Sequence, residues 1–211
     1  VTTVVATDAD TTIPNYSING GADASKLSIN SITGVLSFIA APDFEAPSDA
    51  DANNTYIVTV RASDGTNNVE QTITITILNS NDNNPLISSN GGGATAAIAI
   101  TENRNIVSTV VATDADGTTP TYSISGGADA AKFSISSTNG ILSFVLTPDF
   151  ESPTDADVNN NYVVIVRASD GTNTANQTIS VTVTDLNDNK PVISLNQVFE
   201  IEESSANNTI V

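Results

Sequence analysis

Most of the chain consists of short runs in which apolar and polar residues alternate, separated by turns rich in glycine, asparagine and aspartate. This two-residue period is typical of half-buried β-strands, and no long segment has the period of a helix. The pattern predicts an all-β fold of antiparallel Greek-key sandwiches with about seven short strands each. In the C-terminal half, the predicted strands are Ile98–Thr101, Ile106–Thr113, Thr119–Ser125, Phe133–Ser136, Ile141–Leu146, Tyr162–Ala168 and Asn176–Thr184.

The apolar positions of these strands define one core face, because alternate side chains of a strand point to the same side. A single helical turn is predicted at Ala128–Lys132, with Asp129 as its N-cap and Asp23 in the same role earlier in the chain. The glycine-rich stretch Gly91–Gly93 predicts a loop before the first strand. The predicted core comprises Val110, Ala112, Tyr122, Ile124, Phe133, Ile135, Leu142, Phe144, Phe150, Tyr162, Val164, Val166, Ile179, Val181 and Val183.

The sequence repeats itself at an offset of 106 residues: VVATDAD at Val4–Asp10, for example, returns at Val110–Asp116. A fixed long period indicates tandem copies of one domain, and a chain of this length suits two domains of about 100 residues. Two asparagine-rich linkers, at Asn79–Pro85 and Asp185–Pro191, mark the boundaries. The division is then repeat 1 at 1–84, which lacks its first strand, repeat 2 at 85–190, and the first strand of a third repeat at 191–211.

Acidic residues outnumber basic ones by 24 to 6, for a formal net charge of −18. Nucleic acids and anionic membranes are poor partners for such a chain, because both are bound through basic surfaces. No run approaches the ~20 apolar residues of a membrane span, so no membrane insertion is expected in this segment. The chain has no histidine or cysteine, which removes common catalytic bases, thiolate metal sites and disulfides. Because it starts in mid-pattern, we expect it to be part of a longer protein.

Two interpretations compete for the acidic residues. Carboxylates scattered over a surface aid solubility, whereas clustered carboxylates bind cations. More than half of the acidic residues fall in short repeated motifs, which favours a cation. Ca²⁺ takes six to eight oxygen ligands, which aspartate, glutamate, asparagine and backbone carbonyls supply. A single aspartate beside a glycine, such as Asp64 or Asp116, also suits an ordinary turn.

The acidic motifs and their order resemble those of cadherin repeats. NSNDNNP and DLNDNKP resemble the DxNDNxP linker, DAD resembles DxD, DFE resembles DRE, and ASDG carries the late aspartate. TEN at Glu102 resembles the early XEX motif, and EES at Glu203 repeats it. The resemblance covers the whole chain and implies tandem immunoglobulin-like β-sandwiches. The asparagine-rich loops and the lack of cysteine are more similar to bacterial cadherin-like repeats, and the tryptophan used in vertebrate strand exchange has no counterpart.

The resemblance implies up to three Ca²⁺ ions at the junction of repeats 1 and 2. The base of repeat 1, the linker and the top of repeat 2 would share them. The implied ligands are Asp43 and Glu45, then Asn81 and Asp82 with the carbonyls of Ser80 and Asn83, then Asp114, Asp116 and Asp170. Their six carboxylates would balance the charge of three Ca²⁺. Without cations, the repulsion among them would leave the linker mobile.

Two incomplete sites are implied at the outer ends. One would face a repeat upstream of the chain, and the other would face the third repeat. The implied upstream ligands are Asp8, Asp10 and Asp64. The implied downstream ligands are Glu102, Asp149, Glu151, Asn187 and Asp188 with the carbonyls of Leu186 and Asn189. Both sites are expected to bind Ca²⁺ weakly or not at all in this chain.

Other functional interpretations have less support. The repeated loop at Ser48–Asn54 begins like an EF-hand but lacks its later glycine and glutamate, so a polar solvated loop is favoured over a separate Ca²⁺ site. Asp43 and Glu45 could form the carboxylate pair of a glycosidase. Aromatic residues make up only 5% of the chain, and most are assigned to the core. The sequence therefore predicts no enzyme. Arg61 and Arg167 are expected on the surface.

The predicted function is that of a Ca²⁺-rigidified spacer or adhesion region in a large extracellular or cell-surface protein, such as a bacterial adhesin. Its expected partners are neighbouring cadherin-like repeats of the same chain, with no nucleic acid. The alternative is a Ca²⁺-dependent ligand-binding module that holds a polysaccharide or makes homophilic contact with another copy.

Overall fold

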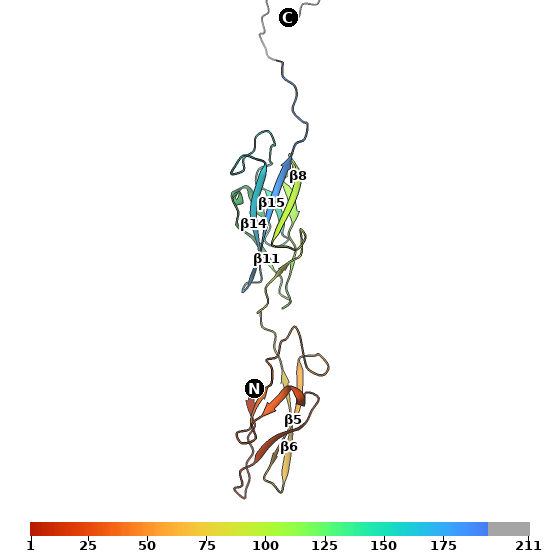
Figure 1. Ribbon diagram of the computed structural model, residues 1–211, viewed down its shortest axis with the longest axis vertical. Helices are drawn as coiled ribbons and strands as arrows, with labels where there is room; N and C mark the ends of the chain where they lie inside the picture. The colour runs from red at the N-terminus through yellow and green to blue at the C-terminus, as the bar shows by residue number, and fades with distance from the viewer. Residues whose placement is uncertain (194–211) are drawn as a thin grey trace, which may run out of the picture.

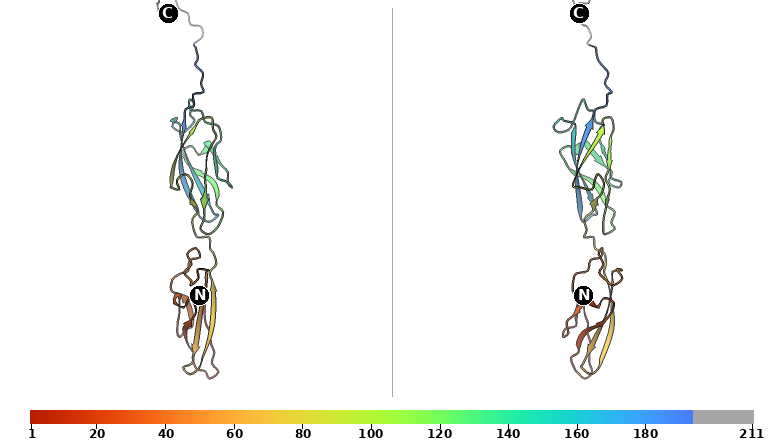
Figure 2. Two further views of the ribbon diagram at one scale, coloured as in Figure 1. Left: turned by 90° about the vertical axis from the view of Figure 1, so that its right-hand side faces the viewer. Right: turned by 45° about the vertical axis from the view of Figure 1, so that its right-hand side comes forward.

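The computed structural model describes residues 1–193 and contains two β-sandwich units joined by an extended linker (Figure 1). The units lie one beyond the other along the long axis of the molecule, as two further views also show (Figure 2). The strand predicted within 191–211 falls outside the described residues, apart from its first three positions. No helix in the described part of the chain is long and apolar enough to cross a membrane.

Unit one is formed by strands β1 to β6. One of its sheets has the order β1-β4-β3 and the other has the order β2-β5-β6. A single 3₁₀ turn, η1, precedes β3. The elements are β1 Thr2–Thr3, β2 Asn15–Gly20, η1 Ala24–Lys26, β3 Leu27–Ile29, β4 Val35–Phe38, β5 Thr55–Ser63 and β6 Asn68–Thr76.

Unit two, formed by strands β7 to β15, repeats this plan and extends it. Its larger sheet has the order β11-β14-β15-β8, in which β8 pairs in parallel with β15. The second sheet is β12-β13-β9, and β7 pairs with β10. The elements are β7 Leu86–Ile87, β8 Thr95–Thr101, β9 Ile106–Thr109, β10 Ala112–Thr113, β11 Thr121–Gly126, η2 Ala130–Lys132, β12 Phe133–Ile135, β13 Ile141–Phe144, β14 Asn161–Ser169 and β15 Thr174–Thr184.

The core of unit two lies between its sheets and confirms the predicted apolar face. Leu142 of β13 and Val164 of β14 are fully buried, although they belong to different sheets. Every predicted core residue is buried or packs against the buried cluster. Ile87 and Ala168 also belong to this buried cluster. Ile87 was not predicted, because a strand of two residues is too short to show a periodic pattern.

The single strand predicted at Ile106–Thr113 is wrong, because the structure divides it between two partners. β9 pairs with β13, whereas β10 pairs with β7. Between them, the Val110 N–H donates to the Gly140 carbonyl at 2.8 Å, and the Val110 side chain is buried. The alternation of apolar residues continues through the switch, so the pattern alone cannot reveal it.

A fully buried glutamine fastens the glycine-rich loop between β7 and β8. The Gln177 amide nitrogen donates to the carbonyl of Gly93 at 2.8 Å and to that of Ser89 at 3.3 Å. Its amide oxygen accepts a hydrogen bond from the Asn90 amide at 3.2 Å. The loop predicted at Gly91–Gly93 is thus confirmed, and a buried side chain of β15 fixes its path.

The Gln177→Leu variant should destabilise unit two by about 1–3 kcal/mol, because it leaves buried loop carbonyls without donors. Gln71, which lies 106 residues earlier, is exposed in β6 and provides the matched control. We expect Gln71→Leu to change stability by less than about 0.5 kcal/mol. Urea unfolding followed by circular dichroism measures both, and an equal effect of the two variants would contradict the anchoring role.

Candidate metal centre at the junction

Carboxylates from both units and from the linker converge where the two units meet. One oxygen from each of Glu45, Asp82 and Asp116 lies within 4.8 Å of the others. The same is true of Asp114, Asp116 and Asp170. Asp116 therefore belongs to both clusters, and it is also the most buried residue of the five, with 9% of its surface exposed.

The segment that follows β10 holds Asp114 and Asp116 in position. The Tyr122 hydroxyl accepts the Ala112 N–H at 2.9 Å, which fixes the chain two residues before Asp114. The Asp116 N–H then donates to the Asp114 carboxylate at 2.9 Å, so the backbone turns between the two aspartates. Hydrogen bonds from the Asn83 amide and backbone N–H hold the pKa of Asp116 below its usual value. Asp116 is therefore ionised at neutral pH.

Asp170 is presented by a tight turn between β14 and β15. Its carboxylate accepts the N–H groups of Thr172 and Asn173, both at 2.6 Å. Burial alone would raise the pKa of Asp170, but these N–H groups outweigh it and lower the pKa.

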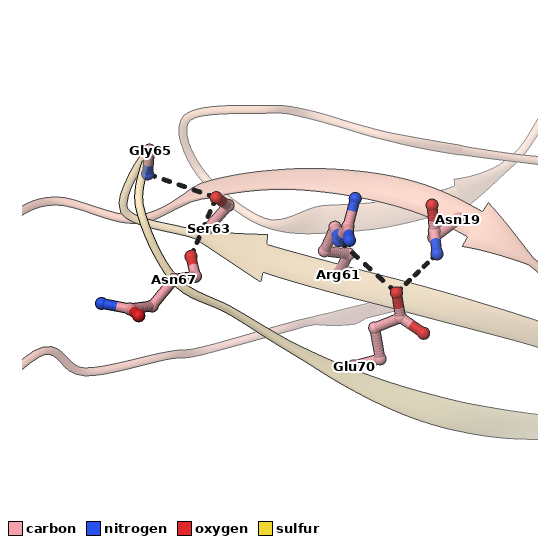
Figure 3. A network of polar contacts seen from close by, with 6 residues as sticks. All are labelled: Asn19, Arg61, Ser63, Gly65, Asn67 and Glu70. Carbon is pink, nitrogen blue, oxygen red and sulfur yellow. Dashed lines mark hydrogen bonds and ion pairs between the residues drawn. The ribbon is translucent and has the colours of Figure 1, made fainter.

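The same turn is built in unit one, where Ser63 Oγ bridges the Gly65 N–H and the Asn67 carbonyl (Figure 3). Arg61 lies beside it on the outer face of β5 and pairs with Glu70 at 3.4 Å, as expected for a surface charge. The repeated motif therefore encodes a repeated carboxylate-presenting turn.

The Asn81 side chain lies against the second cluster. One end of its amide lies 3.1 Å from Asp116 Oδ2 and 3.0 Å from Asp170 Oδ2, and the other end lies 3.2 Å from the Thr172 hydroxyl. With protein atoms alone, the amide would gain by turning its nitrogen toward the carboxylates.

Two buried carboxylate oxygens of the junction have no hydrogen-bond partner among the described residues. They are Glu45 Oε1 in the first cluster and Asp114 Oδ2 in the second. Partial burial raises the pKa of Glu45, and the neighbouring Asp116 adds to the rise. Unpartnered buried oxygens are costly, and a cation is the partner that would satisfy them. An all-oxygen donor set of this kind fits a hard ion such as Ca²⁺.

The remaining predicted junction ligands lie nearby but are engaged elsewhere. The Asp43 carboxylate accepts the N–H groups of Glu45 and Ala46, at 3.0 and 3.2 Å, and lies outside both clusters. The Ser80 carbonyl accepts the Asp82 N–H at 2.9 Å. Asp43 and Ser80 nevertheless line the same hollow as Glu45 and Asp82.

The far end of unit two brings together part of the implied downstream site. Carboxylate oxygens of Glu102, Asp149 and Glu151 lie within 4.8 Å of one another. The buried Glu102 also accepts the N–H of Leu186 at 2.9 Å, which ties the chain after β15 to this end. Of the others, Asp188 accepts hydrogen bonds from Asn103 at 2.6 Å and from Asn189 at 3.1 Å, and Asn187 is exposed.

The carboxylates of the implied upstream site do not converge as those of the other two sites do. Asp8 and Asp64 line one hollow at the end of unit one, and the Asp10 N–H donates to the Asp8 carboxylate at 2.7 Å. No cluster of three carboxylates forms there among the residues that the structure describes. Backbone hydrogen bonds from Asn67 and Thr66 lower the pKa of Asp64.

The acidic residues at η1 and η2 and in the loop at Ser48–Asn54 lie outside the junction and contact the backbone. Asp23 and Asp129 do not cap η1 and η2 with their side chains, so that prediction is wrong. In the loop at Ser48–Asn54, the nearly buried Asp49 accepts the N–H of Asn53 at 2.8 Å and that of Asn54 at 3.3 Å. The loop is thus held by its own carboxylate and is not fully solvated.

Sequence reasoning missed Thr172 and Asn173 as junction residues. Thr172 bonds the Asn81 side chain, and the Asn173 amide bonds the Asn83 carbonyl at 2.9 Å. The signal was present, because the repeated VRASDGTN motif includes both residues.

Comparison with known proteins agrees with this architecture. The family model of the cadherin domain matches residues 96–184. A crystal structure of human protocadherin-24 EC1-2 (form II) is similar with a TM-score of 0.67 and 21% identity, over 88% of this chain and 88% of that chain. A structure of mouse cadherin-23 EC22-24 has a TM-score of 0.56 and 24% identity, over 82% of this chain and 53% of that chain.

Drosophila N-cadherin EC1-4 has a TM-score of 0.63 and 14% identity, over 84% of this chain and 44% of that chain. A search among curated proteins finds no match. At these identities, the structural likeness concerns the fold, and the family model adds the sequence relationship. Residues 96–184 therefore match the cadherin-domain family model, and the described residues have the fold of cadherin β-sandwiches.

Proposed function

We propose that the junction binds Ca²⁺ and that the chain is a Ca²⁺-stiffened extender region of a large secreted or surface protein. The observation that carries the proposal is the convergence of carboxylates from both units and the linker, where oxygens of Glu45, Asp82 and Asp116, and of Asp114, Asp116 and Asp170, lie within 4.8 Å of one another. Cadherin domains are extracellular, non-enzymatic adhesion modules that generally bind Ca²⁺, which agrees with this donor set.

The mechanism is electrostatic. Glu45 belongs to unit one, Asp82 to the linker and Asp116 to unit two, so their mutual repulsion acts across the junction. A bound Ca²⁺ would supply positive charge that all three groups share. Because the ligands come from both units, binding would also fix the angle between them.

The proposed division places repeat 1 at 1–84, repeat 2 at 85–190 and the start of a third repeat at 191–211. The junction then combines ligands from two repeats, whereas the outer sites hold ligands from one repeat only. Extracellular Ca²⁺ modules bind at about 10⁻⁴–10⁻³ M. We expect the junction in that range and the outer sites to be weaker.

Calcium titration of the 211-residue chain tests the proposal. Calorimetry should detect uptake at submillimolar to millimolar Ca²⁺, and small-angle scattering should show a narrower range of overall dimensions as the junction stiffens. Mg²⁺ should substitute poorly, because it requires compact octahedral coordination. Absence of both uptake and stiffening at several millimolar Ca²⁺ would refute the proposal.

The polysaccharide alternative receives no support from the described residues. Sugar binding would need an exposed row of aromatic rings, whereas Tyr56, Tyr162, Phe133 and Phe144 are all buried. Three of these rings pack against one another in the core of unit two.

A further inference from the structure

The linker, residues 79–83, is hydrogen-bonded to only one of the two units that it joins. Asn79 donates from its amide to the Asp116 carbonyl at 2.9 Å. Asn83 donates twice to the Asp116 carboxylate, from its backbone N–H at 2.8 Å and from its amide at 2.9 Å. All three bonds end on unit two.

A second set of bonds runs from unit two back to the linker. The Asn173 amide donates to the Asn83 carbonyl at 2.9 Å and approaches the Asn81 carbonyl at 3.4 Å. The Asn81 amide lies 3.2 Å from the Thr172 hydroxyl, so in either orientation it is hydrogen-bonded to unit two. The donor side chains of Asn79, Asn81, Asn83 and Asn173 together form what we call the asparagine clamp.

On the side of the linker that faces unit one, carboxylates take the place of amide donors. No hydrogen bond within residues 1–193 joins the linker to residues 1–78. The groups that converge there are the carboxylates of Glu45, Asp82 and Asp116, none of which carries a hydrogen-bond donor when ionised. An ionised carboxylate only accepts hydrogen bonds, so these groups cannot bond to one another at neutral pH.

We propose that the asparagine clamp fastens the linker to unit two without any cation, so that the hinge of the junction lies between Ile77 and Asn79. The cation then has to fix only the contact with unit one. That last step rests on the proposed function, whereas the clamp itself does not. The two are compatible, because the Asn83 carbonyl has two lone pairs and can accept Asn173 and a cation together.

The test is amide hydrogen exchange of the full chain by NMR, with a chelator present so that no Ca²⁺ contributes. The Asn83 N–H, which donates to Asp116, should be protected in the wild type. In Asn173→Ala its exchange should accelerate about tenfold, the factor expected for the loss of one or two net hydrogen bonds. An unprotected Asn83 N–H in the wild type would overturn the clamp.

Asn67→Ala is the matched control. Asn67 and Asn173 each donate to the aspartate of their own turn, at 3.3 and 3.4 Å, but only Asn173 also reaches the linker. We expect Asn67→Ala to leave exchange at Asn83 unchanged. An equal effect of both variants would overturn the clamp.

A second variant, Asn79→Asp, exchanges an amide donor for a carboxylate beside the Asp116 carbonyl. It should accelerate exchange at Asn83 in chelator, and unchanged exchange would argue against a contribution from Asn79. Titration of the same samples with Ca²⁺ then tests the proposed function separately. Failure of Ca²⁺ uptake would leave the chelator results, and hence the clamp, standing.

Discussion

Replacing Asp116 by asparagine should remove nearly all cation binding at the junction. Asp116 is the one residue shared by both carboxylate clusters there, so a single change weakens two candidate positions. Loss of a group that merely orients a metal ligand typically weakens metal binding about 10- to 100-fold. For a shared ligand we expect at least about 100-fold, measured by calorimetric Ca²⁺ titration.

Asp10→Asn is the matched control for this variant, because Asp10 lies 106 residues before Asp116 in the repeat and belongs to neither junction cluster. It should leave calcium uptake at the junction and the scattering response unchanged. If both variants lost the same amount of binding, the cation would not be held where the clusters lie. Unfolding curves in chelator should show that Asp116→Asn still folds, because asparagine keeps an oxygen for the Asn83 N–H.

Asp129→Ala should destabilise unit two by about 2–6 kcal/mol, from the loss of acceptors for two buried N–H groups at ~1–3 kcal/mol each. Asp129 is 3% exposed, and its two oxygens accept the N–H groups of Ala156 at 2.7 Å and Val163 at 2.8 Å. It therefore joins η2 to β14 and to the loop before that strand. Denaturant unfolding of the variant measures the loss.

The magnitude separates this role from helix capping. A lost N-cap costs about 1 kcal/mol, so a loss of that size would instead support the capping role. Asp23→Ala provides an independent replicate, because Asp23 makes the equivalent bonds to Ala50 and Ile57, both at 2.7 Å. Asp129→Asn should recover part of the stability, since its amide oxygen can still accept one N–H.

The geometry around Asp129 explains why the sequence suggested a cap. Asp129 does stand at the N-terminal position of η2. Gly127, with φ of +108°, brings the chain so close to β14 that a Cβ would lie 2.4 Å from the Val163 carbonyl oxygen. This close approach carries the carboxylate to the neighbouring backbone. Local sequence signals a cap, but the tertiary contact competes for the same oxygens and wins.

Strands, core and repeat could be predicted because they depend on local pattern. The period of two residues determines which side chains share a face of a strand. The 106-residue offset shows that the same motifs occur twice in the sequence. Most carboxylates of the candidate site were also predicted, since the motifs recur in order. The resemblance to cadherin repeats implied that these carboxylates converge at one junction. The distances between their oxygens are known only from the structure.

The amino-acid pattern alone was enough to predict an acidic, all-β chain in which one set of oxygen-rich motifs occurs twice. Which groups those oxygens face depends on how distant segments pack together in the fold. Asp129 and Gln177 turn inward to satisfy buried backbone groups. Within residues 1–193, Asp114 and Glu45 each have a junction oxygen without a hydrogen-bond partner, and the amides of Asn79 and Asn83 donate to unit two. The physical reason is that a hydrogen bond or a metal ligand depends on distance in space, and sequence periodicity specifies only the face of a strand.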